Sequence, residues 1–148
     1  MLQRSQSLFL LAVFLLSLTL LTGPFARIQT EAGDLLLKHS GYFSEQGDRL
    51  DAATWPLSVL FSVVTLLSFL NIFFYRNRIR QIRICVFLML VFLGVEGIMF
   101  YYAWIIDQLG FIPLWRFVVP PINIILAYLA MRRIRRDELL VKAYDRIR

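Results

Sequence analysis

Four apolar runs, each close to the length of a membrane-spanning helix, divide this chain of 148 residues. The runs cover residues 8–26, 55–75, 84–106 and 111–131. A bilayer core about 30 Å thick needs ~20 apolar residues in a helix, so each run is predicted to cross a membrane once. The runs leave no room for a second folded domain. The sequence therefore predicts one membrane domain over residues 1–148, an all-α antiparallel bundle of four transmembrane helices.

The polar segments between the runs alternate in charge. Residues 76–83 contain four arginines and no acid, and residues 132–148 contain six arginines and one lysine against three acids. Residues 27–54 contain five acids and three bases. Because short basic loops stay in the cytoplasm, we expect 76–83 to be a cytoplasmic loop and 132–148 a cytoplasmic tail. With residues 27–54 as the outer loop, both chain termini are predicted to be cytoplasmic.

The first run also admits a second interpretation, a cleaved signal peptide. Arg4 precedes an apolar stretch, as a signal peptide requires. Pro24 lies in the exit from this run, where a small residue is wanted. A retained first span is therefore the favoured prediction, and the other three runs keep the same orientation under either interpretation.

The outer loop 27–54 is the longest polar segment. Within it, residues 31–39 could form one or two helical turns, with Leu35, Leu36 and Leu37 resting at the membrane interface. The loop is too short to be a domain, and it shows neither a nucleophile elbow nor a glycine-rich phosphate-binding pattern. We predict no further structure for it.

Metal and catalytic chemistry have little support in the sequence. Cys85 and His39 are the single cysteine and the single histidine, so neither a disulfide within the chain nor a zinc site is expected. Nothing in the sequence supplies the second carboxylate, the His–Asp pair or the nucleophile that most hydrolytic or acyl-transfer mechanisms require. The sequence therefore favours a protein that is not an enzyme and that uses no metal or cofactor.

Polar side chains within the third and fourth runs form the one constellation that could carry chemistry. If these helices pair about a turn near residue 108, Glu96 lies level with Asn123 and Arg116 lies about one turn nearer the outer surface. Pro120 and Pro121 lie in the middle of the fourth run, where they leave backbone carbonyls without donors and predict a helix break. The expected intramembrane polar cluster is thus Glu96, Arg116 and Asn123 beside that break.

Two interpretations of this cluster stay open. Charged residues inside a membrane are costly and often mark function, which favours a transport path through Glu96 and Arg116. A neutral Glu96 bonded to Asn123, or an ion pair between Glu96 and Arg116, would instead lock two helices together. We favour the structural lock.

The cytoplasmic arginines form a candidate contact surface, which we name the basic surface: Arg76, Arg78, Arg80, Arg83, Arg132, Arg133, Arg135 and Arg136. The tail that holds the last four is predicted to continue the fourth run as a basic helical extension. Each such arginine gains about 1 kcal/mol near anionic phospholipid head groups, so the surface can simply anchor the orientation. The sharper alternative is docking of another membrane or cytoplasmic protein. Nucleic acid is a poor fit, because acidic residues interrupt the tail.

Three segments carry a resemblance to a known family. They are MLQRSQSL at residues 1–8, NIFFYRNR at 71–78 with QIRIC at 81–85, and RRDELLVK at 135–142 with DRIR at 145–148. Together they resemble a family of small four-span inner-membrane proteins of Bacteroidota, a domain of unknown function. This resemblance implies four helices, an uncleaved first span and a location in a bacterial inner membrane. It supplies no catalytic residues.

The functional prediction follows from the basic surface rather than from the intramembrane polar cluster of Glu96, Arg116 and Asn123. We expect a non-enzymatic scaffold or accessory subunit that contacts partners or anionic lipid through the basic surface. The alternative is a small transporter, proton-coupled or lipid-handling, that uses Glu96 and Arg116. A homo-oligomer is compatible with either, because small bundles often associate to bury polar faces.

Overall fold

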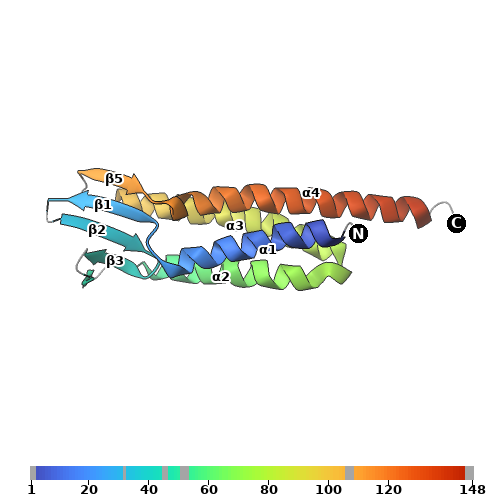
Figure 1. Ribbon diagram of the computed structural model, residues 1–148, viewed down its shortest axis with the longest axis horizontal. Coiled ribbons are helices and arrows are strands. Elements are labelled where there is room, and N and C mark those ends of the chain that lie inside the picture. Colours follow the sequence, from blue (N-terminus) through green and yellow to red (C-terminus); the bar gives the residue numbers. More distant parts are fainter. Residues whose placement is uncertain (1–2, 32, 45–46, 51–53, 106–108, 146–148) are drawn as a thin grey trace.

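A bundle of α-helices with a β-sheet at one end makes up the protein (Figure 1). The computed structural model describes residues 3–31, 33–44, 47–50, 54–105 and 109–145. The helices are α1 (Gln3–Thr22), α2 (Trp55–Phe73), α3 (Arg78–Trp104) and α4 (Val119–Asp145), with 3-10 turns η1 (Phe74–Arg76) and η2 (Trp115–Val118). The strands are β1 (Ala26–Thr30), β2 (Gly33–Lys38), β3 (Gly41–Ser44), β4 (Arg49–Leu50) and β5 (Gly110–Pro113).

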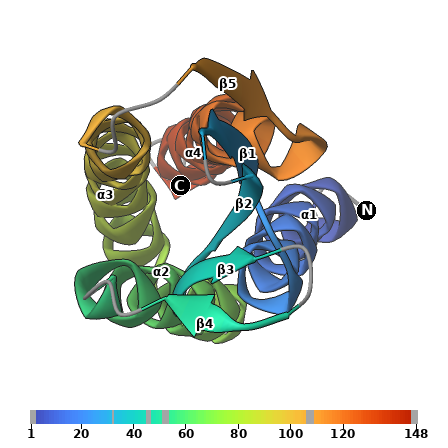
Figure 2. The same ribbon diagram turned by 90° about the vertical axis from the view of Figure 1, so that its left-hand side faces the viewer.

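The helices form a closed ring in which α1 packs on α2 and α4, and α3 packs on α2 and α4 (Figure 2). The start of α1 and the end of α4 lie at the end of the bundle opposite the sheet, and α4 extends beyond the other helices there (Figure 1). We name this end the basic end, because the arginines of α3 and of the α4 extension lie on it. The predicted helical extension of the fourth run is therefore present as far as Asp145. Residues 146–148 of the predicted tail lie outside the described residues.

Three helical segments are long and apolar enough to cross a membrane: Trp55–Phe73, Arg78–Trp104 and Trp115–Val141. The apolar part of α1 among the described residues, Ser7–Thr22, is shorter than these three. Large apolar side chains point outward from every helix, as Leu15, Leu66, Leu90 and Ile125 illustrate. Such a surface suits contact with lipid rather than with water.

Buried apolar side chains fill the bundle in two clusters. The larger begins under the sheet, where Phe25, Ile28 and Leu37 are fully buried, and continues along the helices through residues such as Phe61 and Phe92. The smaller lies at the basic end, and its members are Leu10, Cys85, Ala130, Met131 and Ile134. The sheet and the helices therefore share one buried apolar cluster.

The sheet is the main departure from the sequence prediction, because the chain is not all-α. Its five strands pair antiparallel in the order β4-β3-β2-β1-β5. Strands β2, β3 and β4 come from the predicted outer loop 27–54, and β5 comes from the connection between α3 and α4. Strand β1 begins at Ala26, so the predicted first span 8–26 is too long at its end, where α1 stops at Thr22. Arg27 lies between Leu36 of β2 and Ile112 of β5 in this register. The α1–α2 and α3–α4 connections are thus joined into one sheet.

The predicted helical turns at residues 31–39 are wrong, since Gly33–Lys38 is strand β2. The backbone explains the difference. Gly33 and Gly41 adopt φ of 124° and 148°, a region that glycine enters without strain and that lets the chain reverse at each end of β2. Pairing on both sides then gives the backbone N–H and C=O groups of β2 their partners.

The prolines of the fourth run begin a helix rather than break one. The fourth run was predicted as one span from residue 111, but its first part is β5 and η2, and α4 begins at Val119. Pro120 and Pro121 therefore occupy the first turn, where a missing N–H costs no helical hydrogen bond. The carbonyl of Arg116, expected to lack a donor, accepts from the N–H of Val119.

The predicted cytoplasmic loop 76–83 is also mostly helical. After η1, the helix α3 begins at Arg78, so Arg78, Arg80 and Arg83 lie on its first two turns. The turn predicted near residue 108 falls on residues 106–108, which lie outside the described residues.

Candidate functional site

Asn123 of α4 is fully buried and points toward α1. Its Nδ2 donates to Oγ of Ser17 at 3.2 Å, and that hydroxyl donates in turn to the carbonyl of Val13 at 2.7 Å. Ser17 is also fully buried. A buried chain of polar groups therefore joins α4 to the middle of α1.

Arg116 also faces α1. Its guanidinium donates to the carbonyl of Pro24 and to Oγ1 of Thr22, both at 3.4 Å, and it lies 4.8 Å from the ring centre of Trp115. A Cβ on Gly23 would collide with this guanidinium. The glycine at the end of α1 therefore leaves the space in which the arginine lies.

Glu96 does not join these two residues. It is half-buried on α3, and among the described residues its buried Oε2 has no hydrogen-bond partner. Arg116 and Asn123 lie seven residues apart, so they share the side of the chain that meets α1. The predicted cluster is thus divided: two of its members bind α1, and Glu96 lies apart on α3.

Sequence reasoning missed the partners of Arg116 and Asn123. Ser17 and Thr22 are polar residues within a leucine-rich run, which is a signal for helix contacts in a membrane. The pairing was not predicted because spacing alone favoured α3 as the neighbour of α4, whereas α4 packs against both α1 and α3.

The basic end brings together the two arginine-rich segments that the sequence separates. Nη1 of Arg78, on the first turn of α3, donates to the backbone carbonyl of Asp137 on α4 at 3.0 Å. Around this contact the remaining described arginines are exposed: Arg80, Arg83, Arg132, Arg133, Arg135 and Arg136. The side chain of Arg76 lies outside what the structure describes. The hydrogen bond from Arg78 to Asp137 joins the two arginine-rich segments of the basic surface, one on α3 and the other on α4.

Two buried hydrogen bonds join α2 to α3 next to the basic surface. Nδ2 of Asn71 donates to Sγ of Cys85 at 3.3 Å, and Nε2 of Gln81 donates to the backbone carbonyl of Asn71 at 3.2 Å. All three side chains are buried. They hold the end of α2 against the start of α3, where the basic surface begins.

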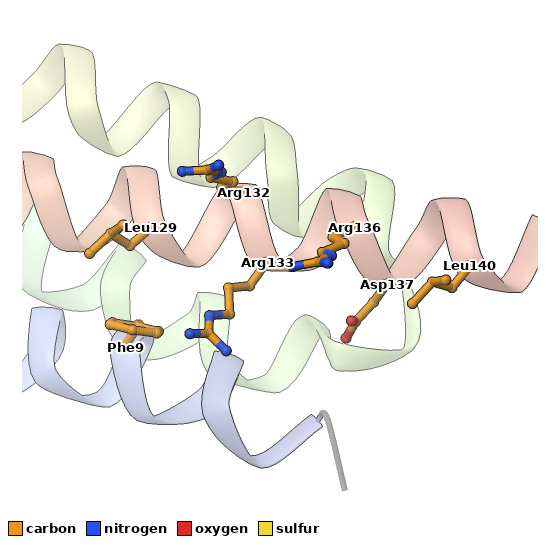
Figure 3. Close-up of a pocket in the computed structure, with 7 residues that line it drawn as sticks. All are labelled: Phe9, Leu129, Arg132, Arg133, Arg136, Asp137 and Leu140. Carbon is orange, nitrogen blue, oxygen red and sulfur yellow. The ribbon is translucent and has the colours of Figure 1, made fainter.

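A pocket of about 590 Å³ opens beside the basic surface, between the start of α1 and the far part of α4 (Figure 3). Its lining residues are Phe9, Leu129, Arg132, Arg133, Arg136, Asp137 and Leu140. The guanidinium carbon of Arg133 lies 5.6 Å from the ring centre of Phe9, and Figure 3 shows this arginine reaching from α4 toward α1. The pocket combines apolar and cationic walls.

The arginines of this pocket were predicted as part of the basic surface, whereas Phe9, Leu129 and Asp137 were missed. Leu129, Arg133 and Asp137 follow one another at intervals of four, so they share one face of α4. That signal was available from the sequence. The contribution of Phe9 was not, because it depends on α1 packing beside α4.

Metal chemistry gains no support from the described part of the chain. There, no three His, Cys, Asp or Glu side chains lie together as a metal site requires.

A family model matches residues 2–147, nearly the whole chain. The chain belongs to the DUF4293 family. The family is described as a domain of unknown function, so the predicted resemblance to an uncharacterised family is confirmed. No curated protein and no solved structure matches this DUF4293 chain. The sites described above are therefore the basis for a functional proposal.

Proposed function

We propose that this DUF4293 protein is a four-span protein of the bacterial inner membrane, with both termini in the cytoplasm, that serves as a non-enzymatic scaffold or accessory subunit. Its basic surface contacts a membrane or cytoplasmic protein together with anionic phospholipid. The observation that carries the proposal is the hydrogen bond from Arg78 to the carbonyl of Asp137. This bond holds two arginine-rich helices together as one surface.

The orientation rests on the positions of the charges. The arginines of the basic surface lie at the basic end. The opposite end carries the sheet, in which Arg27 forms an ion pair with Asp34 at 3.6 Å. Because positively charged segments stay in the cytoplasm, the basic end faces inward and the sheet faces outward. The shorter apolar helix α1 then crosses the membrane with the other three.

Cysteine labelling tests the orientation. Asp48 at the sheet end and Arg135 at the basic end are both exposed, and Cys85 is buried. With Cys85→Ala as background, we expect a membrane-impermeant maleimide to label Asp48→Cys, but not Arg135→Cys, in spheroplasts. Labelling of Arg135→Cys before lysis would overturn the proposed orientation.

Charge reversal tests the contact surface. We expect Arg80→Glu with Arg83→Glu to remove proteins that co-purify with the wild-type chain from native membranes at low salt. The matched control is Arg49→Glu, an exposed arginine at the sheet end, which should leave the co-purified proteins unchanged. If the double variant retains every partner, the basic surface is not the contact region.

Glu96 supports a second candidate function, a small proton-coupled or lipid-handling transporter. Its carboxylate carries a buried oxygen without a hydrogen-bond partner among the described residues, and ionisable groups within membranes mark transport paths. This function requires that Glu96→Gln abolish transport in reconstituted vesicles while the protein stays folded. Our first proposal expects Glu96→Gln to leave partner binding unchanged.

A further inference from the structure

We propose that the pocket between α1 and α4 is a specific binding site for one anionic phospholipid. Its arginines would hold the phosphate, and its apolar wall would hold the upper part of an acyl chain. This inference rests on the proposed function, because it gives the basic surface one defined ligand and a place where that ligand binds.

The position of the pocket matches the level of lipid head groups. The apolar part of α4 ends at Met131, and the arginines of the pocket begin with Arg132. On the facing helix, Phe9 lies near the start of the apolar part of α1. The cationic wall therefore lies just outside the apolar layer, where the phosphates of a bilayer lie.

The polar wall suits a phosphate. Arg132, Arg133 and Arg136 line the pocket together with one carboxylate, that of Asp137. In Figure 3 the side chains of Arg133 and Asp137 reach toward α1, whereas Arg132 lies on the other side of α4 in this view. Guanidinium groups offer planar pairs of N–H donors that bind phosphate oxygens with two parallel hydrogen bonds. Arg132 and Arg136 lie four residues apart and share one face of α4, and Arg133 lies on the neighbouring face with Asp137. The pocket therefore offers guanidinium groups from two adjacent faces of one helix, and basic pockets between membrane helices bind anionic head groups.

The apolar wall indicates a lipid rather than a free phosphate. Phe9, Leu129 and Leu140 line the same pocket. From Leu129 an exposed apolar stripe continues along α4 through Ile125 and Ile122 toward the bilayer centre. A soluble anion would leave this surface unused, whereas an acyl chain would cover it.

The size of the pocket agrees with this ligand. Its volume of about 590 Å³ lies within the ~300–1,000 Å³ range of small-molecule sites. This is enough for a glycerophosphate head group and the first part of a chain. The guanidinium of Arg133 lies over the ring of Phe9, so the cationic and apolar parts of the pocket lining meet at this pair.

Native mass spectrometry of the full chain in detergent tests the proposal, with phosphatidylglycerol as the probe and phosphatidylcholine as the neutral comparison. We expect the wild type to retain one phosphatidylglycerol in preference to phosphatidylcholine. The variant Arg132→Gln, Arg133→Gln and Arg136→Gln should bind phosphatidylglycerol about tenfold or more weakly, because it loses several charge-assisted hydrogen bonds.

A matched control removes the same charge elsewhere on the basic surface. Arg80→Gln, Arg83→Gln and Arg135→Gln leave the pocket lining intact. Because specific lipid binding is confined to the pocket in this proposal, and the rest of the basic surface is left to the protein partner, this variant should bind phosphatidylglycerol within about twofold of the wild type. Equal losses in the two triple variants would overturn the single site. The proposed function would survive that result, because its partner contact is tested separately through Arg80 and Arg83.

Leu129→Trp separates a lipid from a free phosphate and keeps every charge. The larger ring should fill the apolar wall and weaken phosphatidylglycerol binding about fivefold or more. Glycerol 3-phosphate should not displace the bound lipid at equal concentration. Displacement, or unchanged lipid binding by Leu129→Trp, would overturn the lipid assignment. If the pocket triple variant fails to fold, Leu129→Trp still tests whether the pocket binds the lipid.

One further outcome would reassign the pocket. If the pocket triple variant keeps phosphatidylglycerol but loses a co-purified protein that the control triple variant retains, the pocket is a protein-docking site and the proposal is wrong.

Discussion

The hydroxyl of Tyr42 donates a hydrogen bond to the backbone carbonyl of Tyr102 across 2.8 Å. Tyr42 lies on β3, and Tyr102 lies in the last turn of α3, so the bond joins the sheet to the bundle. Burial, followed by the neighbouring Tyr102 and Tyr101, raises the pKa of Tyr42 to about 12. The hydroxyl therefore remains a donor through neutral and moderately alkaline pH.

Tyr42→Phe should loosen the sheet without removing it. The variant loses one buried hydrogen bond, and its free energy of unfolding should fall by about 1 kcal/mol. Thermal unfolding of the purified protein in detergent measures this. Tyr101→Phe is the matched control, because Tyr101 is 59% exposed, and it should not change the Tm. An equal Tm for Tyr42→Phe and wild type would show that the bond does not hold the sheet.

Gly23→Ala should displace the guanidinium of Arg116, because a Cβ at this position occupies the same space. The arginine then loses its donation to the carbonyl of Pro24, and we expect a cost of about 1–2 kcal/mol in unfolding free energy. Gly97→Ala is the control, since a Cβ there meets no atom within 4 Å. That change should stabilise α3 slightly.

A double-mutant cycle with Arg116→Leu makes this prediction specific. If Gly23→Ala acts through Arg116, the double variant should be little less stable than Arg116→Leu alone. Additive losses would mean that Gly23 is required for the backbone of the α1–β1 connection and not for the arginine.

Ser17→Ala should destabilise the protein more than Asn123→Leu. The serine variant leaves the buried Nδ2 of Asn123 without an acceptor. Asn123→Leu instead removes that donor together with an Oδ1 that has no hydrogen-bond partner among the described residues. Leaving a buried polar group unpaired costs about 1–3 kcal/mol, although hydrogen bonds between membrane helices average only about 0.6 kcal/mol. Chemical unfolding in mixed micelles measures the free energy of unfolding of both variants and so ranks them. The opposite order would show that Asn123 is needed for a different contact.

The helices could be predicted from the sequence, but their boundaries near the sheet could not. The leucine-rich run 8–26 and the run 84–106, which contains Trp104, are each long enough to be identified as a helix by length alone. The strands are two to six residues long. Strand β2 carries three consecutive leucines, which hide the alternation by which a strand is recognised.

The sheet also depends on contacts that no local pattern contains. Ala26 of β1 pairs with Leu37 on one side and with Pro113 on the other, and Pro113 follows two further helices along the chain. The same limit applies to the candidate site. The arginines were visible as a charge pattern, whereas Phe9 and the acceptor Thr22 became visible only once α1 was placed beside α4.

His39 provides a pH-dependent test of the sheet end. It is the single histidine of the chain, and its carbonyl accepts hydrogen bonds from Oγ1 of Thr54 at 3.1 Å and from Oγ of Ser58 at 2.8 Å. Burial, and secondarily the positive charge of Lys38, lowers the pKa of the imidazole below its usual value of 6.5. The folded protein therefore binds this proton less readily than the unfolded chain does.

The sign of the pH effect follows from this difference. The contribution of His39 to stability is fully present above pH 6.5, and it falls as the pH drops from there through the folded-state pKa. We expect the Tm of the wild type to decrease over that range relative to His39→Gln, which has no titrating group. The titration can be followed in the same samples by NMR of the single imidazole. An imidazole that titrates at or above pH 6.5 would mean that the side chain is solvated and that the sheet end is more open than the structure shows.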